Sequence, residues 1–395
     1  MNRSINLPRT IISIAFIATG IFLFFVQNYS PNSAAAAAYG SELFAAPQTA
    51  QAASSGMPNF ENAKVESRPL SASLSDEISR WAKSAAEPQW LGYAVPVVDS
   101  EGVICCNNDW NGNSGCGTCK LENGEHGVNF GSTKSTRAEL EGPRYVVVLY
   151  RANGGAVQKI RVVSEICNVD AGGLRVTWLS GVDPANSVDY LSTFVHGQEL
   201  RDHNPERLVQ GALNAIAMHA GPAADKAMNS FVAPGEPASL RKQAVFWLGA
   251  ARGSSGFQTL KQLAKSDPDG QVRAQVAFAL SVSHESAAVD EMIRMAREDE
   301  STHVRGQALF WLAQKAGKKA GSAITGAIDN DPDTEVKKKA VFALSQMPKE
   351  EGVPKLIEVA ETNKNREVRK QAMFWLGQSN DPRALAFFEK ILESK

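Results

Sequence analysis

The sequence predicts a mainly α-helical protein, in which an α-solenoid of about six helical hairpins follows a small antiparallel β domain. The first observation behind this prediction is a helical phrase that recurs every 32 residues. Its five strong copies are LRKQAVFWLG from Leu240, VRAQVAFALS from Val272, VRGQALFWLA from Val304, VKKKAVFALS from Val336 and VRKQAMFWLG from Val368. A degraded copy, LVQGALNAIA, begins in register at Leu208. Such a fixed period is typical of solenoids, because no single unit buries its own apolar face.

The second observation is a strand-like pattern upstream of the repeats. Its three segments are RYVVVLYR from Arg144, AVQKIRVVS from Ala156 and LRVTWL from Leu174, with Asn153-Gly154-Gly155 and Asp170-Ala171-Gly172-Gly173 between them. Segments rich in β-branched and aromatic residues, separated by Gly-rich turns, are typical of hairpins. We therefore predict a three-stranded antiparallel meander, with LGYAVPVV from Leu91 as a fourth strand.

Composition narrows the function class. The chain has 395 residues, 43% of them apolar, and a formal net charge of −1. The apolar content is enough to bury a substantial core. The near-zero charge argues against a general affinity for nucleic acid, which requires concentrated Lys and Arg.

The N-terminus has the pattern of an export signal. Arg3 and Arg9 precede an apolar run over residues 11–26, and small residues follow over residues 33–38. We interpret residues 1–38 as a signal peptide or, alternatively, an uncleaved membrane anchor. Either interpretation places the body of the protein outside the cytoplasm.

Three further segments complete the domain plan. Residues 39–72 are rich in Ala, Ser and Pro and predict a flexible linker. Residues 73–200 form the Cys-bearing β domain with flanking helices, and residues 205–395 form the solenoid. One flanking helix is predicted from Ser75, with Ile78 and Trp81 packed on the domain. Another is predicted from Asp183, as N-cap, through Val195.

The cysteines lie in the predicted β domain. They are Cys105, Cys106, Cys116, Cys119 and Cys167. Structural disulfides fit an exported protein. A zinc site built from these thiolates and a redox dithiol at Cys116 and Cys119 are the two alternatives.

The sequence of each repeat predicts two helices. In the second helix the apolar positions recur at Leu260, Met292, Ile324, Leu356 and Phe388. Asp267-Pro268 and Asp331-Pro332 precede the first helix, where we expect Asp as N-cap and Pro at the first helical position.

These features resemble HEAT repeats, of the short type also found in phycobilin lyases. The resemblance rests on the helical hairpin, the Asp-Pro entry and the Val-Arg start of the first helix, and it covers residues 205–395. It implies an α-solenoid and, with the export signal, a bacterial, exported protein. It implies no single activity, because such solenoids carry unrelated functions.

Deoxyhypusine hydroxylases are catalytic relatives of such repeats, with a di-iron site held by His-Glu pairs near the start of the first helix. The matching positions here are Lys242-Gln243, Ala274-Gln275, Gly306-Gln307, Lys338-Lys339 and Lys370-Gln371. None of them supplies an imidazole or a carboxylate, so we expect no iron site there.

Three side-chain patterns run through the repeats. A phenylalanine recurs at Phe246, Phe278, Phe310, Phe342 and Phe374, where we favour packing between neighbouring units over an exposed stripe. The next position alternates as Trp247, Ala279, Trp311, Ala343 and Trp375, which suggests a true period of 64 residues. A basic position recurs at Arg241, Arg273, Arg305, Lys337 and Arg369. The aspartates Asp267, Asp299 and Asp331 lie six residues before the second, third and fourth of these, which predicts an Asp–Arg ladder.

The sequence therefore predicts a non-enzymatic scaffold of the cell envelope, periplasmic, envelope-associated or extracellular, that binds a protein partner on its solenoid surface. We expect no cofactor, no metal and no nucleic acid, and membrane contact only through an uncleaved N-terminal anchor. Two alternatives remain: a redox or metal-binding protein acting through the loop of Cys116 and Cys119, and a lyase-like enzyme on the HEAT scaffold.

Overall fold

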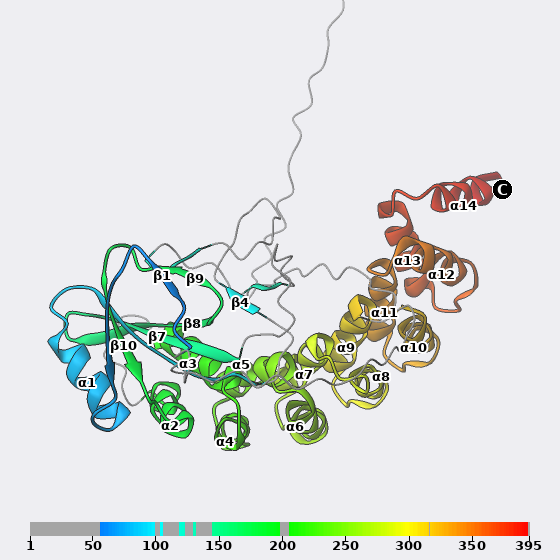
Figure 1. Ribbon diagram of the computed structural model, residues 1–395. Helices are drawn as coiled ribbons and strands as arrows, with labels where there is room; N and C mark the ends of the chain where they lie inside the picture. The colour runs from blue at the N-terminus through cyan, green and yellow to red at the C-terminus, as the bar shows by residue number, and fades with distance from the viewer. Residues whose placement is uncertain are drawn as a thin grey trace, which may run out of the picture. The chain divides into compact units, whose positions relative to one another are not determined.

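A computed structural model describes residues 56–98, 103–105, 118–122, 129–131, 144–197, 205–315 and 317–393 (Figure 1). The chain divides into two compact units, Met1–Ala52 and Ala53–Lys395, and the described residues all belong to the second. The predicted export signal lies outside the described residues. Within them, none of the helices combines the length and the apolar character that crossing a membrane requires.

The β region contains a five-stranded sheet with the order β2-β10-β3-β7-β8. These strands are β2 (Lys64–Pro69), β10 (Arg175–Ser180), β3 (Gln89–Pro96), β7 (Tyr145–Asn153) and β8 (Ala156–Ser164). A smaller sheet joins β1 (Asn59–Glu61), β9 (Asn168–Asp170) and β5 (Cys119–Lys120), while β4 (Val103–Cys105) pairs with β6 (Asn129–Gly131).

The predicted meander is wrong in its last strand. The β7–β8 hairpin is confirmed, with Gly154 and Gly155 at positive φ in its turn. Strand β10, however, pairs in parallel with β3 and β2 instead of continuing from β8. Trp178 and Leu179 point to opposite faces of the sheet and are both buried, which suits an interior parallel strand.

The predicted linker also needs correction, because part of it is folded. Strands β1 and β2 lie within residues 39–72, and β2 pairs along its whole length with β10. All six residues of β2 are exposed, so the strand leaves no apolar alternation in the sequence. Backbone hydrogen bonds at the edge of the sheet hold it in place.

Helices cover one face of the five-stranded sheet. The two predicted flanking helices are confirmed as α1 (Leu74–Ser84) and α2 (Pro184–Val195). Ile78 and Trp81 of α1 are buried, and the side chain of Asp183 caps α2. The other face of the sheet packs against a separate apolar cluster around Trp90 and Trp178.

The repeats form two layers of helices (Figure 1). The inner layer contains α3 (Pro205–Met218), α5 (Ala238–Ala251), α7 (Gly270–Val282), α9 (Thr302–Lys315), α11 (Thr334–Ser345) and α13 (Arg366–Gln378). The outer layer contains α4 (Pro222–Phe231), α6 (Gly253–Ser266), α8 (Ala288–Glu298), α10 (Gly317–Asn330), α12 (Lys349–Thr362) and α14 (Pro382–Glu393). Each inner helix contacts the next inner helix along the row. The mainly helical solenoid with a small β region is thus confirmed.

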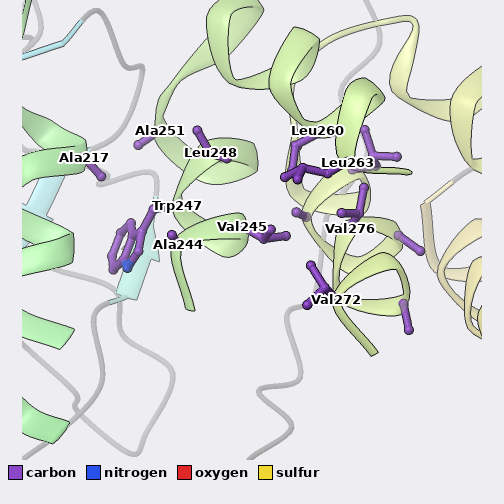
Figure 2. Close-up of a cluster of buried hydrophobic side chains, with 14 of the residues drawn as sticks. Ala217, Ala244, Val245, Trp247, Leu248, Ala251, Leu260, Leu263, Val272 and Val276 are labelled. Carbon is purple, nitrogen blue, oxygen red and sulfur yellow. The ribbon is translucent and has the colours of Figure 1, made fainter. Parts of the chain in front are cut away.

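Each inner helix buries two opposite sides against its neighbours. Figure 2 shows Trp247 directed from α5 toward Ala217 of α3, whereas Val245 is directed toward α7. Because apolar side chains leave every helix in both directions, one continuous buried cluster runs from the sheet through the repeats.

The N-cap prediction was two residues too early. The caps of α7, α11 and α13 are Asp269, Asp333 and Asn365, whose side chains accept from backbone N–H groups of the first turn. Asp267 instead ends α6 and accepts from the N–H of Asp269. The earlier aspartate thereby keeps its carboxylate available for another contact.

The β region closes the first repeat. Strand β8 contacts α3, and Val97 at the end of β3 forms an antiparallel bridge with His219. Arg252 reaches back from the end of α5 and donates to the carbonyl oxygens of Ala217 and His219. The sheet and the first hairpin therefore share one interface.

Candidate interaction surface

The exposed side of the inner layer carries a row of aromatic rings. Its members in spatial order are Trp247, Phe246, Phe278, Trp311, Phe310, Phe342, Trp375 and Phe374. Each ring contacts the next, with centroids between 4.5 and 5.9 Å apart. Five consecutive inner helices, α5 to α13, thus share one unbroken strip of aromatic surface.

The alternation of Trp and Ala explains how the row is built. Phe246 stacks directly on Phe278 at 5.7 Å, and Phe310 stacks on Phe342 at 5.9 Å. Between these two pairs Trp311 inserts and contacts Phe278 at 4.5 Å. Ala279 and Ala343 stand where the direct stacks form, and both are fully buried. The geometry therefore confirms the period of 64 residues.

The prediction that the phenylalanines pack between units is confirmed, but the rings also reach the surface. Phe246, Phe278, Phe310 and Phe342 are half-buried, and Phe374 is 54% exposed. Rings at helical spacing usually disappear into a core. Here they support one another through stacked, tilted and edge-to-face contacts and still present area to solvent.

Amide and ammonium groups flank the rings. One helical turn before each phenylalanine stand Gln243, Gln275, Gln307, Lys339 and Gln371, all half-buried. The Oε1 atom of Gln243 is buried and has no hydrogen-bond partner among the described residues. Trp247 is buried against α3, so we call the rings from Phe246 to Phe374, together with these five residues and Lys242, the aromatic face.

The predicted basic ladder is confirmed, with a different pairing. Arg273 donates its Nη1 to the backbone oxygen of Asp267, while its Nε and Nη2 hold the carboxylate of Asp299 at 2.8 and 3.0 Å. The hydrogen bonding to the carboxylate of Asp299 raises the pKa of Arg273. The carboxylate therefore comes from the following repeat, and the ladder joins repeats instead of capping a single one.

We call the contact between one repeat and the next a junction. The Arg–Asp pairing is the same at three junctions and changes at the fourth. The buried pairs are Arg241–Asp267, Arg273–Asp299 and Arg305–Asp331. At the fourth junction the corresponding residues are Lys337 and Asn363, and Lys337 donates to the backbone oxygen of Asp329. Because the three Arg–Asp pairs are buried in contacts between repeats, this part of the ladder is structural.

The cysteine predictions are only partly within the described residues. Cys105 lies in β4, Cys119 in β5, and Cys167 immediately before β9. Cys119 and Cys167 are fully buried in the apolar cluster behind the sheet. Cys106 and Cys116 lie outside the described residues, so the disulfide, zinc and dithiol interpretations stay predictions. Among the described residues, no group of three or more His, Cys, Asp or Glu side chains is arranged to hold a metal ion.

A buried polar network joins the sheet to the first repeat and was not anticipated from the sequence. The hydroxyl of Ser187 lies 2.8 Å from His219 Nε2 and 2.6 Å from the hydroxyl of Tyr93, which also contacts the hydroxyl of Tyr150. The Nδ1 atom of His219 lies 2.6 Å from the carbonyl oxygen of Ala215. All four side chains are fully buried, so this Ser–His contact has no access to a substrate. Burial lowers the pKa of His219 to about 4 and raises that of Tyr93 to about 12.

The repeat geometry agrees with a family comparison. The model of HEAT repeats matches residues 230–313 and 321–395. The repeats over these residues are similar to HEAT repeats. The matched residues cover the solenoid from the end of α4 onward, and repeats of this kind suggest a protein-interaction scaffold.

Two solved structures resemble the chain at low identity. Human deoxyhypusine hydroxylase in complex with glycerol has 15% identity and a TM-score of 0.23, with 52% of this chain and 90% of that chain covered. Kap121p has 12% identity and a TM-score of 0.32, with 48% of this chain and 25% of that chain covered. No curated protein matches the sequence.

Proposed function

We propose that this protein is a non-enzymatic interaction scaffold that binds a protein partner on the aromatic face. The observation that carries the proposal is the row of partly exposed rings that continues from Phe246 on α5 to Phe374 on α13. Aromatic residues are enriched at the centres of protein interfaces, since they offer large contact area at small entropic cost. A row held rigid by ring–ring contacts lowers that cost further.

Site-specific photocrosslinking tests this function. A photoreactive amino acid replaces Gln243, Gln307 or Gln371 on the aromatic face, and Gln262 on the outer helix α6 is the matched control. We expect crosslinks to a discrete partner from the three inner positions and none from Gln262. Crosslinks only from Gln262, or from none of these positions, would contradict the proposal.

We also propose that the protein is bacterial, is exported and contains structural disulfides. The basic and apolar N-terminal pattern supports export, and the complete burial of Cys119 and Cys167 suits crosslinked cysteines. Alkylation of the natively produced, unfolded protein counts the free thiols by mass. We expect fewer than the five possible adducts before reduction and all five afterwards. Five adducts without reductant would exclude disulfides, and zinc bound to the native protein, measured by elemental analysis, would indicate a zinc site.

A further inference from the structure

The molecule itself shows one way to cover the inner layer. In α3, Gly211 and Asn214 stand at the positions that Gln243 and Phe246 occupy in α5. Strand β8 lies against this part of α3: a Cβ atom on Gly211 would come within 2.8 Å of the backbone oxygen of Ile160. An extended segment thus passes directly over the inner face of the first repeat.

The strand meets this face with alternate apolar side chains. Ile160 and Val162 belong to the cluster shared with the helices, whereas Val163 belongs to the cluster on the opposite side of the sheet. This alternation is the period of two that any extended chain offers to a surface. The aromatic face begins in the next repeat, where coverage by the sheet stops and the small residue gives way to Gln243 and Phe246.

The charges of the aromatic face favour an acidic occupant. Glu335 pairs with Lys338, and Glu367 pairs with Lys370, so these charges cancel. Lys242 forms no ion pair with any described acidic residue, and the same holds for Lys339.

The side chain of Lys339 extends from α11 to α9 of the preceding repeat. A Cβ atom added to Gly306 there would lie 3.2 Å from its Nζ. Burial and then the charge of Lys339 lower the pKa of the neighbouring His303. The face therefore carries positive charge that its own residues leave uncompensated.

We infer that the aromatic face binds an extended acidic segment of a partner protein, which crosses the inner helices with its apolar side chains on the rings. The inference rests on the proposed scaffold function and specifies the partner's chemistry. The half-buried glutamines beside the rings carry amides that can donate to and accept from an extended backbone. With helix axes about 9 Å apart, five helices span about 36 Å, or about 11 extended residues.

Designed peptides test the inference with the full chain. The probe is a peptide of about 11 residues that alternates Phe or Val with Glu. One comparison peptide has the same composition rearranged to a helical apolar spacing, and another has Lys in place of Glu. We expect the alternating acidic peptide to bind at least about tenfold more tightly than either comparison peptide, by fluorescence anisotropy.

Matched charge reversals locate the site. The double variant Lys242→Glu/Lys339→Glu should weaken the alternating peptide by about tenfold, while Lys261→Glu/Lys265→Glu on the exposed side of α6 should leave it unchanged. Equal binding of the helical or basic peptide, equal loss in both variants, or no binding by any peptide would overturn the inference. If crosslinks still form at Gln243, Gln307 and Gln371, the scaffold function stands and only the extended acidic partner is excluded.

Discussion

The two ends of the repeat row differ in what covers them. At the first repeat the sheet packs on α3, and Gly211, Asn214 and His219 are enclosed by it. At the last described repeat, Leu385 is 60% and Leu392 71% exposed. The residues in register with Leu392 are Ala360, Ile328, Ala296 and Ala264, and each is at most 4% exposed. Burial of a solenoid position is therefore decided by the neighbouring unit and hardly by the residue itself.

The residues that pair between successive repeats also differ along the row. The first three are joined by a bidentate Arg–Asp pair, whose members are nearly inaccessible to water. The fourth has Lys337 and Asn363 and no ion pair between them. Since both members change together, no buried charge is left uncompensated. The buried Arg–Asp pairing between inner helices therefore stops at the fourth junction, whereas α14 is joined to α12 by the ion pairs Arg383–Glu350 and Lys390–Glu361.

The largest expected effect comes from breaking one of the Arg–Asp junctions. Arg305→Met leaves the buried carboxylate of Asp331 without its partner, and we expect a loss of about 3–5 kcal/mol in the free energy of unfolding. Lys337→Met at the fourth junction is the matched control and should cost less than about 1 kcal/mol. Urea unfolding monitored by circular dichroism measures both. Equal losses would show that the two junctions are energetically alike.

A smaller loss of stability is expected at the first repeat, which the sheet covers, when the pH is lowered. Burial lowers the pKa of His219 to about 4, below its ordinary value of 6.5, so the unfolded chain takes up the proton first. The stability contributed by neutral His219 is thus complete above pH 6.5 and is lost as the pH falls toward 4, by up to roughly 3 kcal/mol.

The matched variants for this pH effect are His219→Gln and His303→Gln. The first removes the titrating group from the interface with Ser187 and Tyr93, so unfolding free energies measured between pH 6.5 and 4.5 should fall less steeply than in the parent protein. His303 is half-buried on α9, and its replacement should leave most of the slope in place. A slope unchanged by His219→Gln would exclude the sheet interface as its source.

The sequence predicted features that depend on a local period. The 32-residue spacing predicted that the phenylalanines pack between units, as Phe246 does on Phe278, and the recurrent apolar position at Leu260 is buried in every repeat but the last. The exposure of the rings was underestimated, since a row at the open side of a layer is supported from only one direction.

Contacts between distant segments escaped prediction for a physical reason. Arg273 has Asp267 six residues before it and Asp299 26 residues after it, and only the stacking of repeats selects the second carboxylate. The contact of Ser187 with His219 likewise depends on how α2 and α3 pack. Neither pattern has a local sequence signature. The choice between a disulfide, a zinc site and a redox dithiol likewise depends on which groups each cysteine contacts in the folded protein.

The smallest expected effect comes from installing the missing ion pair. Lys337→Arg together with Asn363→Asp gives the fourth junction the residues of the first three, and we expect a favourable coupling energy of about 1 kcal/mol between the substitutions. Asn363→Asp alone should destabilise slightly, because Lys337 reaches the backbone of Asp329 instead of a carboxylate at that position. A double-mutant cycle in urea measures the coupling, and amide hydrogen exchange in α13 should slow only in the double variant. A coupling of zero would mean that the fourth junction has a different geometry and that its Lys–Asn pair is more than a neutral replacement for Arg–Asp.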